Sequence, residues 1–328
     1  MKPIEPDQVR EIAVGFMTSR VLLTAVELDL FTLIGNGSRT SLDVARDASC
    51  DPRGTDRLLN QLVVMGFLSK QDGRFANTPL AAQCLVRGSA GFLGNLAHTA
   101  HLWHSWSTLT DAVRKGGSVA WKPGAVAPEG RQAFIAAMHH GATRQAEEVV
   151  ARLPLTGVRS VLDVGAGSAG WSAAFVRAGV PRVTAFDLPE ILTLTQGYID
   201  RAGLSGSIDT APGDYLTGNL PAGYDLVFMS SILHINSPDE NRSLVCAGAR
   251  SLNPGGLLVV REFLVDQDRT APPHAVSFAL NMLVNTRGGD AYTRGEVSAW
   301  MANAGLQDPQ HIPFPGAADL LIARKPRT

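Results

Sequence analysis

The sequence predicts an α/β chain in which a doubly wound parallel sheet, covered by helices on both faces, follows a mainly helical N-terminal region. Three observations predict it. Apolar runs alternate with helical stretches between residues 160 and 262. The first run, 161–164, leads directly into a cluster of glycines, as a buried strand does when it turns tightly into a helix. Residues 8–85, in contrast, carry apolar side chains mostly at helical spacing.

The N-terminal region is predicted to consist of helices and one short ribbon. Residues 14–31 have helical spacing, Ser41 is the expected N-cap of a second helix, and Pro52 opens a third. Residues 66–76 are typical of a hairpin, because the Asp72–Gly73 pair favours a tight turn between two strands. Helices followed by such a ribbon predict a winged helix.

A loop is predicted to separate the two regions. Residues 116–130 are rich in Gly, Pro and Ala and lie between helical stretches. We therefore expect a helical domain with a connecting helix over residues 8–115 and a second domain over residues 133–328.

The glycine cluster predicts a nucleotide-like cofactor. Gly165, Gly167 and Gly170 let a ligand approach the backbone, and Asp187 ends a second apolar run where a carboxylate can accept both hydroxyls of a ribose. This G-x-G-x-x-G spacing is shared with dinucleotide-binding folds. Asp163, just before the glycines, would repel a pyrophosphate and therefore disfavours a dinucleotide.

The chain resembles a known family in the order of its motifs. Residues 161–167, Val-Leu-Asp-Val-Gly-Ala-Gly, resemble motif I of the class I S-adenosylmethionine-dependent methyltransferases. Residues 212–216, 224–234 and 252–262 follow in the order found in the small-molecule O-methyltransferases of the caffeate, hydroxyindole and bacterial polyketide type. The resemblance extends from about residue 10 to 325 and implies a Rossmann-like methyltransferase domain behind a winged-helix dimerisation domain.

The resemblance also implies which residues bind S-adenosyl-L-methionine. They lie at the ends of the predicted strands, on the side of a parallel sheet where α/β proteins bind ligands. They are Asp163, Gly165, Gly167, Asp187, Leu188, Gly213, Asp214, Tyr215 and Ser230.

His234 is the predicted catalytic base. A phenol has a pKa near 10 and is mostly neutral at pH 7, so a neighbouring histidine can take its proton as the oxygen attacks the methyl group in line. The resembled family uses a histidine in a similar Leu-His loop, with Glu262 as the carboxylate that orients it. The family's Asp-Trp pair after the histidine is replaced by Ile235 and Asn236.

A second carboxylate that normally flanks the histidine is missing. Ala291 stands at its position, and Asp290 is the neighbouring carboxylate that could replace it. This departure leaves room for S-, N- or C-methylation, or for a reaction that uses the cofactor site without transferring a methyl group.

Five histidines gather between residues 98 and 140, at positions 98, 101, 104, 139 and 140. In the resembled family these helices line the acceptor pocket, and we expect the same here. Helix packing and a metal site are the alternatives, and no matching carboxylate or cysteine lies nearby to support a metal. The resemblance implies a substrate-binding set of His101, Trp106, Met138, Asn281 and Met282.

Composition restricts partners and location. The formal net charge is −1 and no apolar segment is long enough to cross a membrane, so we expect neither nucleic acid nor membrane as a partner. Three cysteines without a disulfide or zinc spacing indicate the cytoplasm.

A winged helix also raises the alternative of a ligand-responsive DNA-binding regulator. Residues 39–75 carry six basic and five acidic side chains, which is too balanced for a surface that grips phosphates. We expect a homodimer instead. The first helix should bury part of its apolar set against a second copy: Val21, Leu22, Val26, Leu28 and Phe31.

Overall fold

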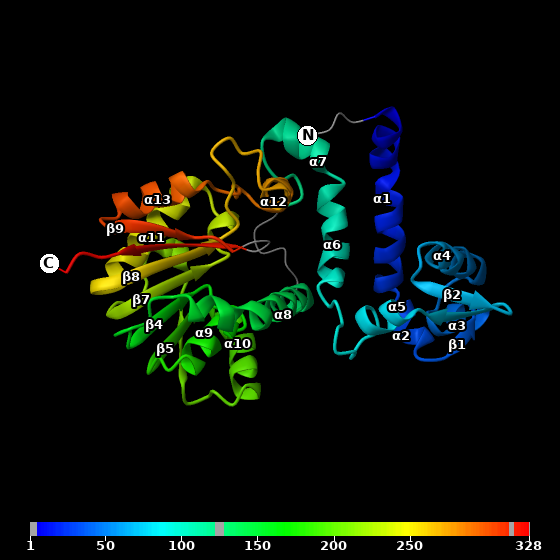
Figure 1. Cartoon of the computed structure of the whole chain (residues 1–328), viewed down its shortest axis with the longest axis horizontal. Coiled ribbons are helices and arrows are strands. Elements are labelled where there is room, and N and C mark those ends of the chain that lie inside the picture. The colour runs from blue at the N-terminus through cyan, green and yellow to red at the C-terminus, as the bar shows by residue number, and fades with distance from the viewer. Residues whose placement is uncertain (1–4, 122–127, 315–317, 328) are drawn as a thin grey trace. The chain divides into compact units, whose positions relative to one another are not determined.

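The computed structural model describes residues 5–121, 128–314 and 318–327 (Figure 1). The chain divides into two compact units, Met1–His104 and Ser105–Thr328, and each is described by itself. The predicted fold class, a helical N-terminal part followed by a mixed α/β part with a mainly parallel sheet, is confirmed.

Helices dominate the first unit. Within its described residues a small antiparallel sheet has the strand order β1-β3-β2. The predicted hairpin is present, with Asp72 and Gly73 at φ values of 50° and 74° in its turn. The elements are α1 (Pro6–Glu27), α2 (Leu30–Ile34), β1 (Ser38–Thr40), α3 (Ser41–Asp47), α4 (Pro52–Val64), β2 (Leu68–Gln71), β3 (Arg74–Asn77) and α5 (Pro79–Cys84), and α6 (Leu96–Trp106) continues across the boundary.

Two local predictions in this unit are corrected. The N-cap of α3 is Thr40, whose hydroxyl oxygen accepts the Asp43 N–H at 3.2 Å, so Ser41 is the first helical residue and not the cap. Strand β1 was not predicted, because three polar residues carry no strand pattern. It exists because Arg39 pairs with Phe75 of β3, a contact between residues far apart in sequence.

The apolar side chains of α1 and of the residues directly after it are divided differently from the prediction. Val21, Leu22, Val26, Leu28 and Phe31 pack into the core of their own unit, and Phe31 is 1% exposed. Phe31 therefore cannot face a second copy, and the expectation is wrong for this residue. Val21, Leu22, Val26 and Leu28 are only half-buried, and their burial against a second copy stays a prediction. The exposed apolar side chains lie in the N-terminal half of the helix, and they are Val9, Ile12, Val14, Phe16 and Met17.

The second unit is built around one sheet. Among the described residues seven strands lie in the order β6-β5-β4-β7-β8-β10-β9, parallel from β6 to β8 and antiparallel at β10 and β9. The elements are α7 (Leu109–Lys115), α8 (Pro128–Ala151), β4 (Ser160–Val164), α9 (Gly170–Arg177), β5 (Arg182–Asp187), α10 (Pro189–Arg201), β6 (Ile208–Pro212), η1 (Tyr215–Thr217), β7 (Tyr224–Ser230), η2 (Leu233–Ile235), α11 (Pro238–Ser251), β8 (Leu252–Glu262), α12 (Pro273–Asn285), α13 (Arg294–Asn303), β9 (Gln307–Ile312) and β10 (Asp319–Arg324).

The loop predicted over residues 116–130 falls partly outside the described residues, since 122–127 are not described. Helix α8 already includes Pro128, so the predicted loop extends too far at its C-terminal end. Proline is favoured in the first turn of a helix, where its missing N–H is not needed.

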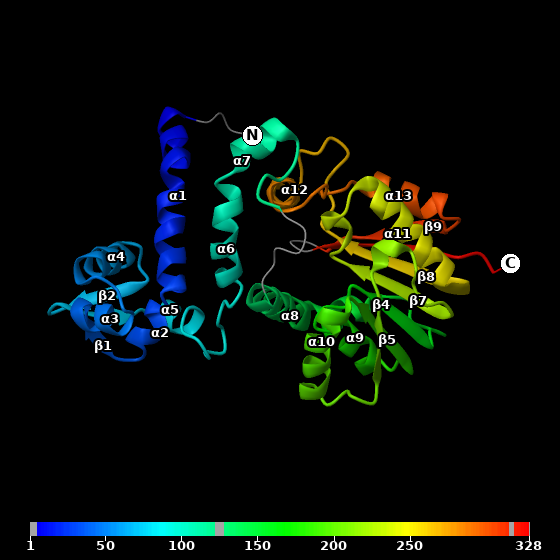
Figure 2. The ribbon, with the colours of Figure 1, turned by 180° about the vertical axis from the view of Figure 1, so that it is seen from behind.

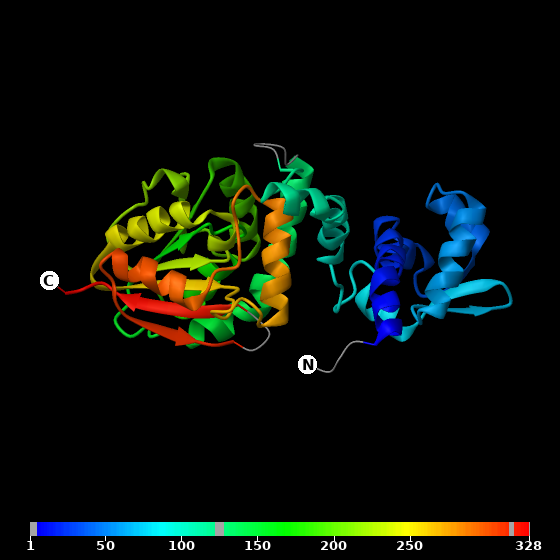
Figure 3. The ribbon, with the colours of Figure 1, turned by 90° about the horizontal axis from the view of Figure 1, so that it is seen from above.

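Helices cover both faces of the sheet, with α11 and α13 on one face and α8, α9 and α10 on the other (Figure 2). Alternate residues of the central strands face these opposite layers. Leu162, Val227 and Leu258 pack with α11 and α13, whereas Phe228 and Val259 pack with α8 and α9. This alternation follows from the two-residue repeat of a strand. The strand order reverses between β4 and β7, which is where α/β sheets form ligand sites, and α12 stands beside the carboxyl ends of the strands (Figure 3).

Candidate functional site

The turn after β4 directs its N–H groups into the protein. Gly165 and Gly167 have φ values of 72° and 54°, a region that favours glycine. The N–H groups of Gly165 and Ala166 donate to the Phe186 carbonyl oxygen at 2.9 and 3.2 Å, and that of Gly167 donates to Asp187 Oδ2 at 2.8 Å. These donors are therefore not aimed outward as a phosphate-binding turn requires, and the arrangement fits a cofactor without phosphate.

Close packing explains two of the predicted cofactor-site glycines. A Cβ on Gly165 would lie 2.7 Å from Ile232 Cγ2, and one on Gly213 would lie 2.5 Å from Phe186 Cζ. The loops after β4, β6 and β7 can approach their neighbours only because these side chains are absent. The glycines thus shape the carboxyl edge of the sheet even before any ligand is considered.

Two carboxylates lie under and beside this turn. Asp163 is 1% exposed and accepts the Ser172 hydroxyl at 2.6 Å, and burial raises its pKa to about 7. Asp187 is also mostly buried, and burial raises its pKa. Its Oδ1 accepts the Leu188 N–H at 2.8 Å and its Oδ2 accepts Gly167, which leaves a further lone pair on each oxygen for a ribose hydroxyl.

The other predicted cofactor residues end the neighbouring strands. Asp214 is exposed and caps η1 by accepting the Leu216 N–H at 2.9 Å. The Tyr215 hydroxyl donates to Asn236 Oδ1 at 3.3 Å, and burial raises its pKa. Ser230 ends β7 and is 8% exposed. The predicted cofactor residues therefore share the carboxyl edge of β4, β5, β6 and β7.

His234 and Glu262 form a buried pair. His234 lies in η2, just past β7, and its Nδ1 is 2.8 Å from Glu262 Oε1. Glu262 ends β8, is 0% exposed and also accepts the backbone N–H groups of Leu233, His234 and Phe263 at 3.1, 3.3 and 2.8 Å. Burial alone would raise the pKa of Glu262, but the His234 charge and these hydrogen bonds outweigh it and lower that pKa.

An ionised Glu262 sets the tautomer of the imidazole. The network assigns the proton to Nδ1, which donates to Glu262, so Nε2 carries the free lone pair. The Phe278 ring of α12 stands edge-on to the imidazole, with centroids 4.8 Å apart, and Phe263 packs on Phe278 at 4.7 Å. The histidine is therefore a hydrogen-bond acceptor in an aromatic setting.

The loop that carries Asp290 lies against this pair without completing it. A Cβ on Gly289 would lie 2.1 Å from the His234 carbonyl oxygen, so the chain passes directly beside the histidine. Asp290 Oδ2 is 3.1 Å from Arg269 Nη1, and its Oδ1 accepts the Ala291 N–H at 2.8 Å. Asp290 thus pairs with Arg269, and among the described residues its carboxylate makes no hydrogen bond to His234.

Two of the predicted acceptor residues meet directly. Trp106 Nε1 donates to Asn281 Oδ1 at 2.9 Å, and Asn285 Nδ2 donates to the same oxygen at 2.9 Å. Asn281 follows Phe278 by one turn of α12, so it lies on the helix that contacts His234. Met282 is 5% exposed on the same helix.

The remaining acceptor candidates lie elsewhere. Met138 is 42% exposed on α8. His101 belongs to the first unit, and its role stays a prediction. No group of three or more possible metal ligands lies together among the residues that the structure describes.

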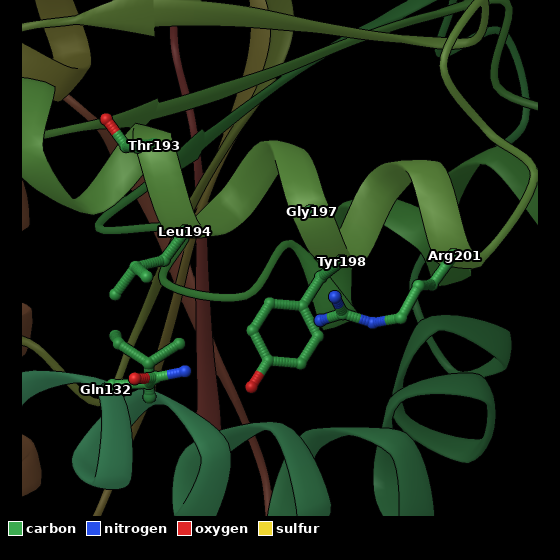
Figure 4. A pocket seen from close by; sticks show the side chains of 7 residues that line it. Gln132, Thr193, Leu194, Gly197, Tyr198 and Arg201 are labelled. Atoms are coloured by element: carbon green, nitrogen blue, oxygen red, sulfur yellow. The ribbon is translucent and has the colours of Figure 1, made fainter. Parts of the chain in front are cut away.

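Several polar and aromatic contacts were missed by sequence reasoning. His139 Nδ1 is 2.9 Å from Ser168 Oγ in the glycine turn, and the rings of His139 and Tyr198 are 4.4 Å apart. Arg201 lies over Tyr198, with Cζ 4.4 Å from the ring centroid. Figure 4 shows the small pocket of about 160 Å³ beside them, lined by Gln132, Ile135, Thr193, Leu194, Gly197, Tyr198 and Arg201. None of the residues predicted for the site lines it.

Arg261 was also missed. It precedes Glu262 on β8 and is 6% exposed. A single arginine in an apolar run gives no signal of what its side chain faces, because that depends on elements far away in sequence.

In the described ranges, no helix is both long enough and apolar enough to cross a membrane. The three cysteines, Cys50, Cys84 and Cys246, carry free thiols.

Comparisons with known proteins agree with this geometry. A family model described as an O-methyltransferase domain matches residues 106–307, and one described as an O-methyltransferase dimerisation domain matches residues 10–87. The chain is 31% identical over 331 residues to the 3-hydroxy-5-methyl-1-naphthoate 3-O-methyltransferase of Streptomyces sahachiroi, covering 98% of this chain and 95% of that protein.

Two further relatives extend the comparison. The chain is 30% identical to the tetracenomycin polyketide synthesis 8-O-methyl transferase TcmO of Streptomyces glaucescens, over 98% of this chain and 97% of that protein. It is 25% identical to the S-adenosyl-L-methionine-dependent methyl transferase PigF of a Serratia species, over 95% and 93%. The solved structure of PigF with SAH has a TM-score of 0.91 and 24% identity, and the match covers 98% of this chain and 100% of that one.

Proposed function

The chain belongs to the S-adenosyl-L-methionine-dependent O-methyltransferase family, and from that premise we propose that His234 is its general base and Glu262 the carboxylate that orients it. The enzyme methylates a small molecule. S-adenosyl-L-methionine supplies an electrophilic methyl group. The observation that carries the proposal is the buried pair of His234 Nδ1 and Glu262 Oε1 at 2.8 Å, which leaves Nε2 as the proton acceptor.

The protein must accept a proton from the acceptor hydroxyl and position the two reactants. His234 takes the proton from the acceptor hydroxyl as its oxygen attacks, and Glu262 stabilises the resulting imidazolium. Holding the two reactants in line contributes a large share of the rate, on the order of 7–11 kcal/mol of the barrier. Phe278 excludes water from one side of the imidazole and favours an aromatic acceptor.

The cofactor site we propose consists of Asp163, Gly165, Gly167, Asp187, Leu188, Gly213, Asp214, Tyr215 and Ser230. The inward N–H groups of the glycine turn and the free lone pairs of Asp187 support it. Asp163 would favour the positive charge at the methionine end from below the turn.

For the acceptor we propose a phenolic, polyketide-type aromatic molecule, as the names of the naphthoate and tetracenomycin relatives suggest. Trp106, Met138, Asn281, Met282 and His101 would line its site. Both hydrogen bonds at Asn281 Oδ1 come from the protein, so the amide nitrogen of Asn281 is the atom that would donate to the acceptor.

We further propose that the first unit is a winged helix that forms a homodimer, with domains over residues 8–115 and 133–328. The exposed apolar side chains of α1 and the match to a dimerisation domain support this. Three of the six basic residues over 39–75 are already paired with carboxylates, Arg39 with Asp47, Arg46 with Asp43 and Arg57 with Asp56, which disfavours nucleic acid as a partner. Free thiols support a cytoplasmic location.

The test is product analysis with a labelled methyl donor. The full-length protein is incubated with a panel of phenolic naphthoates and polyketides, and products are identified by mass spectrometry. One added methyl group on a hydroxyl oxygen is expected. Methylation of carbon or nitrogen in place of oxygen would overturn the proposed acceptor chemistry while leaving the cofactor in place.

A further inference from the structure

Arg261 is a buried cation without an anion. It is 6% exposed, and among the described residues no carboxylate lies within ion-pair distance of its guanidinium. Glu262 is its neighbour in sequence, but strand alternation sends that side chain to the opposite face of the sheet, where it binds His234. Arginine stays charged even though burial lowers its pKa to about 10.

The groups around Arg261 are neutral. Its Nη2 donates to Gln145 Oε1 at 2.7 Å, and its Nη1 donates to Ser231 Oγ at 3.2 Å, with Ser230 Oγ at 3.5 Å. Its Cζ lies 4.7 Å from the centre of the Trp171 ring. Its Nε is buried without a hydrogen-bond partner. These contacts hold the guanidinium in place but do not neutralise it, and a buried unpaired charge is costly.

The position of Arg261 points to the ligand site. Its Cα is in register with that of Ser230 at the carboxyl edge of β7 and β8. Trp171 belongs to the first turn of α9, which follows the glycine turn directly. Gln145 lies on α8, whose His139 contacts the same turn through Ser168, with Nδ1 2.9 Å from Oγ. The guanidinium is thus beside the glycine turn, on the layer formed by α8 and α9.

From this placement we propose that Arg261 binds a ligand carboxylate, and that this carboxylate is the one on the methionine moiety of the cofactor. The inference rests on the cofactor site proposed above. A guanidinium is suited to this task, because it can donate two parallel hydrogen bonds to one carboxylate. The unpartnered Nε and one Nη supply that pair of donors.

Calorimetry with ligands that differ in the carboxylate tests the proposal. Arg261→Met is compared with wild type for S-adenosylhomocysteine, which carries the carboxylate, and for 5′-methylthioadenosine, which lacks the amino-acid part. We expect binding of S-adenosylhomocysteine to weaken by roughly 10- to 100-fold and that of methylthioadenosine to change by less than about twofold. Arg261→Lys keeps the charge, so its affinity for S-adenosylhomocysteine should fall less than that of Arg261→Met.

Arg182→Met is the matched control. Arg182 also lies over an aromatic ring, that of Tyr224, with Cζ 4.6 Å from its centre, but it begins β5 at the opposite edge of the sheet. Its substitution should change neither affinity. Equal weakening of both ligands by Arg261→Met would overturn the proposal, because it would indicate a structural role. Unchanged binding of both would overturn it too.

Two further measurements test the proposal if Arg261→Met does not fold or if the carboxylate belongs to the acceptor. If Arg261→Met does not fold, wild-type protein should still bind S-adenosylmethionine at least about 10-fold more tightly than its decarboxylated form. Equal affinities would contradict the proposal.

The second arm concerns the acceptor. If Arg261→Met leaves S-adenosylhomocysteine binding unchanged but raises KM only for hydroxynaphthoic acids and not for the matching naphthols, the carboxylate belongs to the acceptor and the cofactor assignment is wrong. The binding arms do not depend on which atom is methylated, so they can fail or succeed independently of the proposed acceptor chemistry.

Discussion

Asp163 and Glu262 are both buried carboxylates at the ends of strands in one sheet, and they respond to burial in opposite ways. Asp163, at the end of β4, accepts one side-chain hydrogen bond, and its pKa rises to about 7. Glu262, at the end of β8, accepts three backbone N–H groups and the His234 imidazole, and its pKa falls. Burial by itself therefore does not decide the charge of a carboxylate; the neighbouring His234 charge and the hydrogen-bond donors decide it at Glu262.

The difference divides the proposed site into two functional regions. The region around Glu262 is built to keep a permanent negative charge behind a histidine. The region around Asp163 and Asp187 holds carboxylates that burial makes easier to protonate. A cationic cofactor would restore the charged form of such groups. The following variants test this contrast, beginning with the largest expected effect.

Removing the base should produce the largest effect. His234→Ala should reduce turnover by about 10²- to 10⁴-fold, because the acceptor hydroxyl loses its proton acceptor. Affinity for S-adenosylhomocysteine, measured by calorimetry, should stay nearly constant, since His234 is assigned to the acceptor side. Near-normal turnover of the variant would remove base catalysis from this site while leaving methyl transfer intact.

Removing the proposed ribose contact should have the second-largest effect. Asp187→Ala should weaken binding of S-adenosylhomocysteine by roughly 1.5–3 kcal/mol for each hydrogen bond lost, before water compensates. The substitution also frees the Gly167 N–H that Asp187 accepts, so the glycine turn loses support. Asp290→Ala is the matched control. The Asp290 carboxylate pairs with Arg269, so its removal should not affect cofactor binding. Equal calorimetric affinities for Asp187→Ala and wild type would exclude Asp187 from the cofactor site.

Neutralising Glu262 should have a smaller effect on both rate and stability. Glu262→Gln keeps the shape but loses a charge-assisted bond to His234, and we expect a loss of about 1–2 kcal/mol in the free energy of unfolding. Because the pKa of Glu262 is lowered in the fold, its contribution is full above about pH 4.5, the unfolded value, and is lost as the pH falls through the folded value. Chemical denaturation at several pH values measures this. A penalty that persists unchanged in acid would argue against an ionised Glu262.

The Asp163 variant should behave in the opposite way. Since the pKa of Asp163 rises to about 7, its contribution is full below the unfolded value, near pH 4, and is lost as the pH rises through about 7. Asp163→Asn should therefore change stability little near pH 4 and raise it progressively above that, by roughly 1 kcal/mol per pH unit up to about pH 7. Urea denaturation of the cofactor-free protein at both pH values is the measurement. A destabilised variant at the higher pH would contradict the contrast between the two carboxylates.

Much of this molecule is determined by local sequence. A run of apolar residues ending in Asp163, followed by glycines at 165 and 167, can hardly form anything except a buried strand and a tight turn, because other residues tolerate those dihedral angles poorly. The Asp72–Gly73 pair specifies its hairpin for the same reason. The meeting of His234 and Glu262 was also predictable, through the resemblance to the family, since each follows or ends a strand of one parallel sheet.

The tertiary structure alone decided which distant partners meet. Strand β1 forms only because β3 offers it an edge, Trp106 contacts Asn281 across 175 positions of sequence, and the apolar side chains of α1 divide between core and surface according to the packing of α2 and α4. Arg261 and Glu262 are adjacent in sequence, yet one faces neutral side chains and the other a histidine. The sequence shows that the two side chains point to opposite faces; what each face contains depends on the order of the strands, which is set by the packing of the whole sheet.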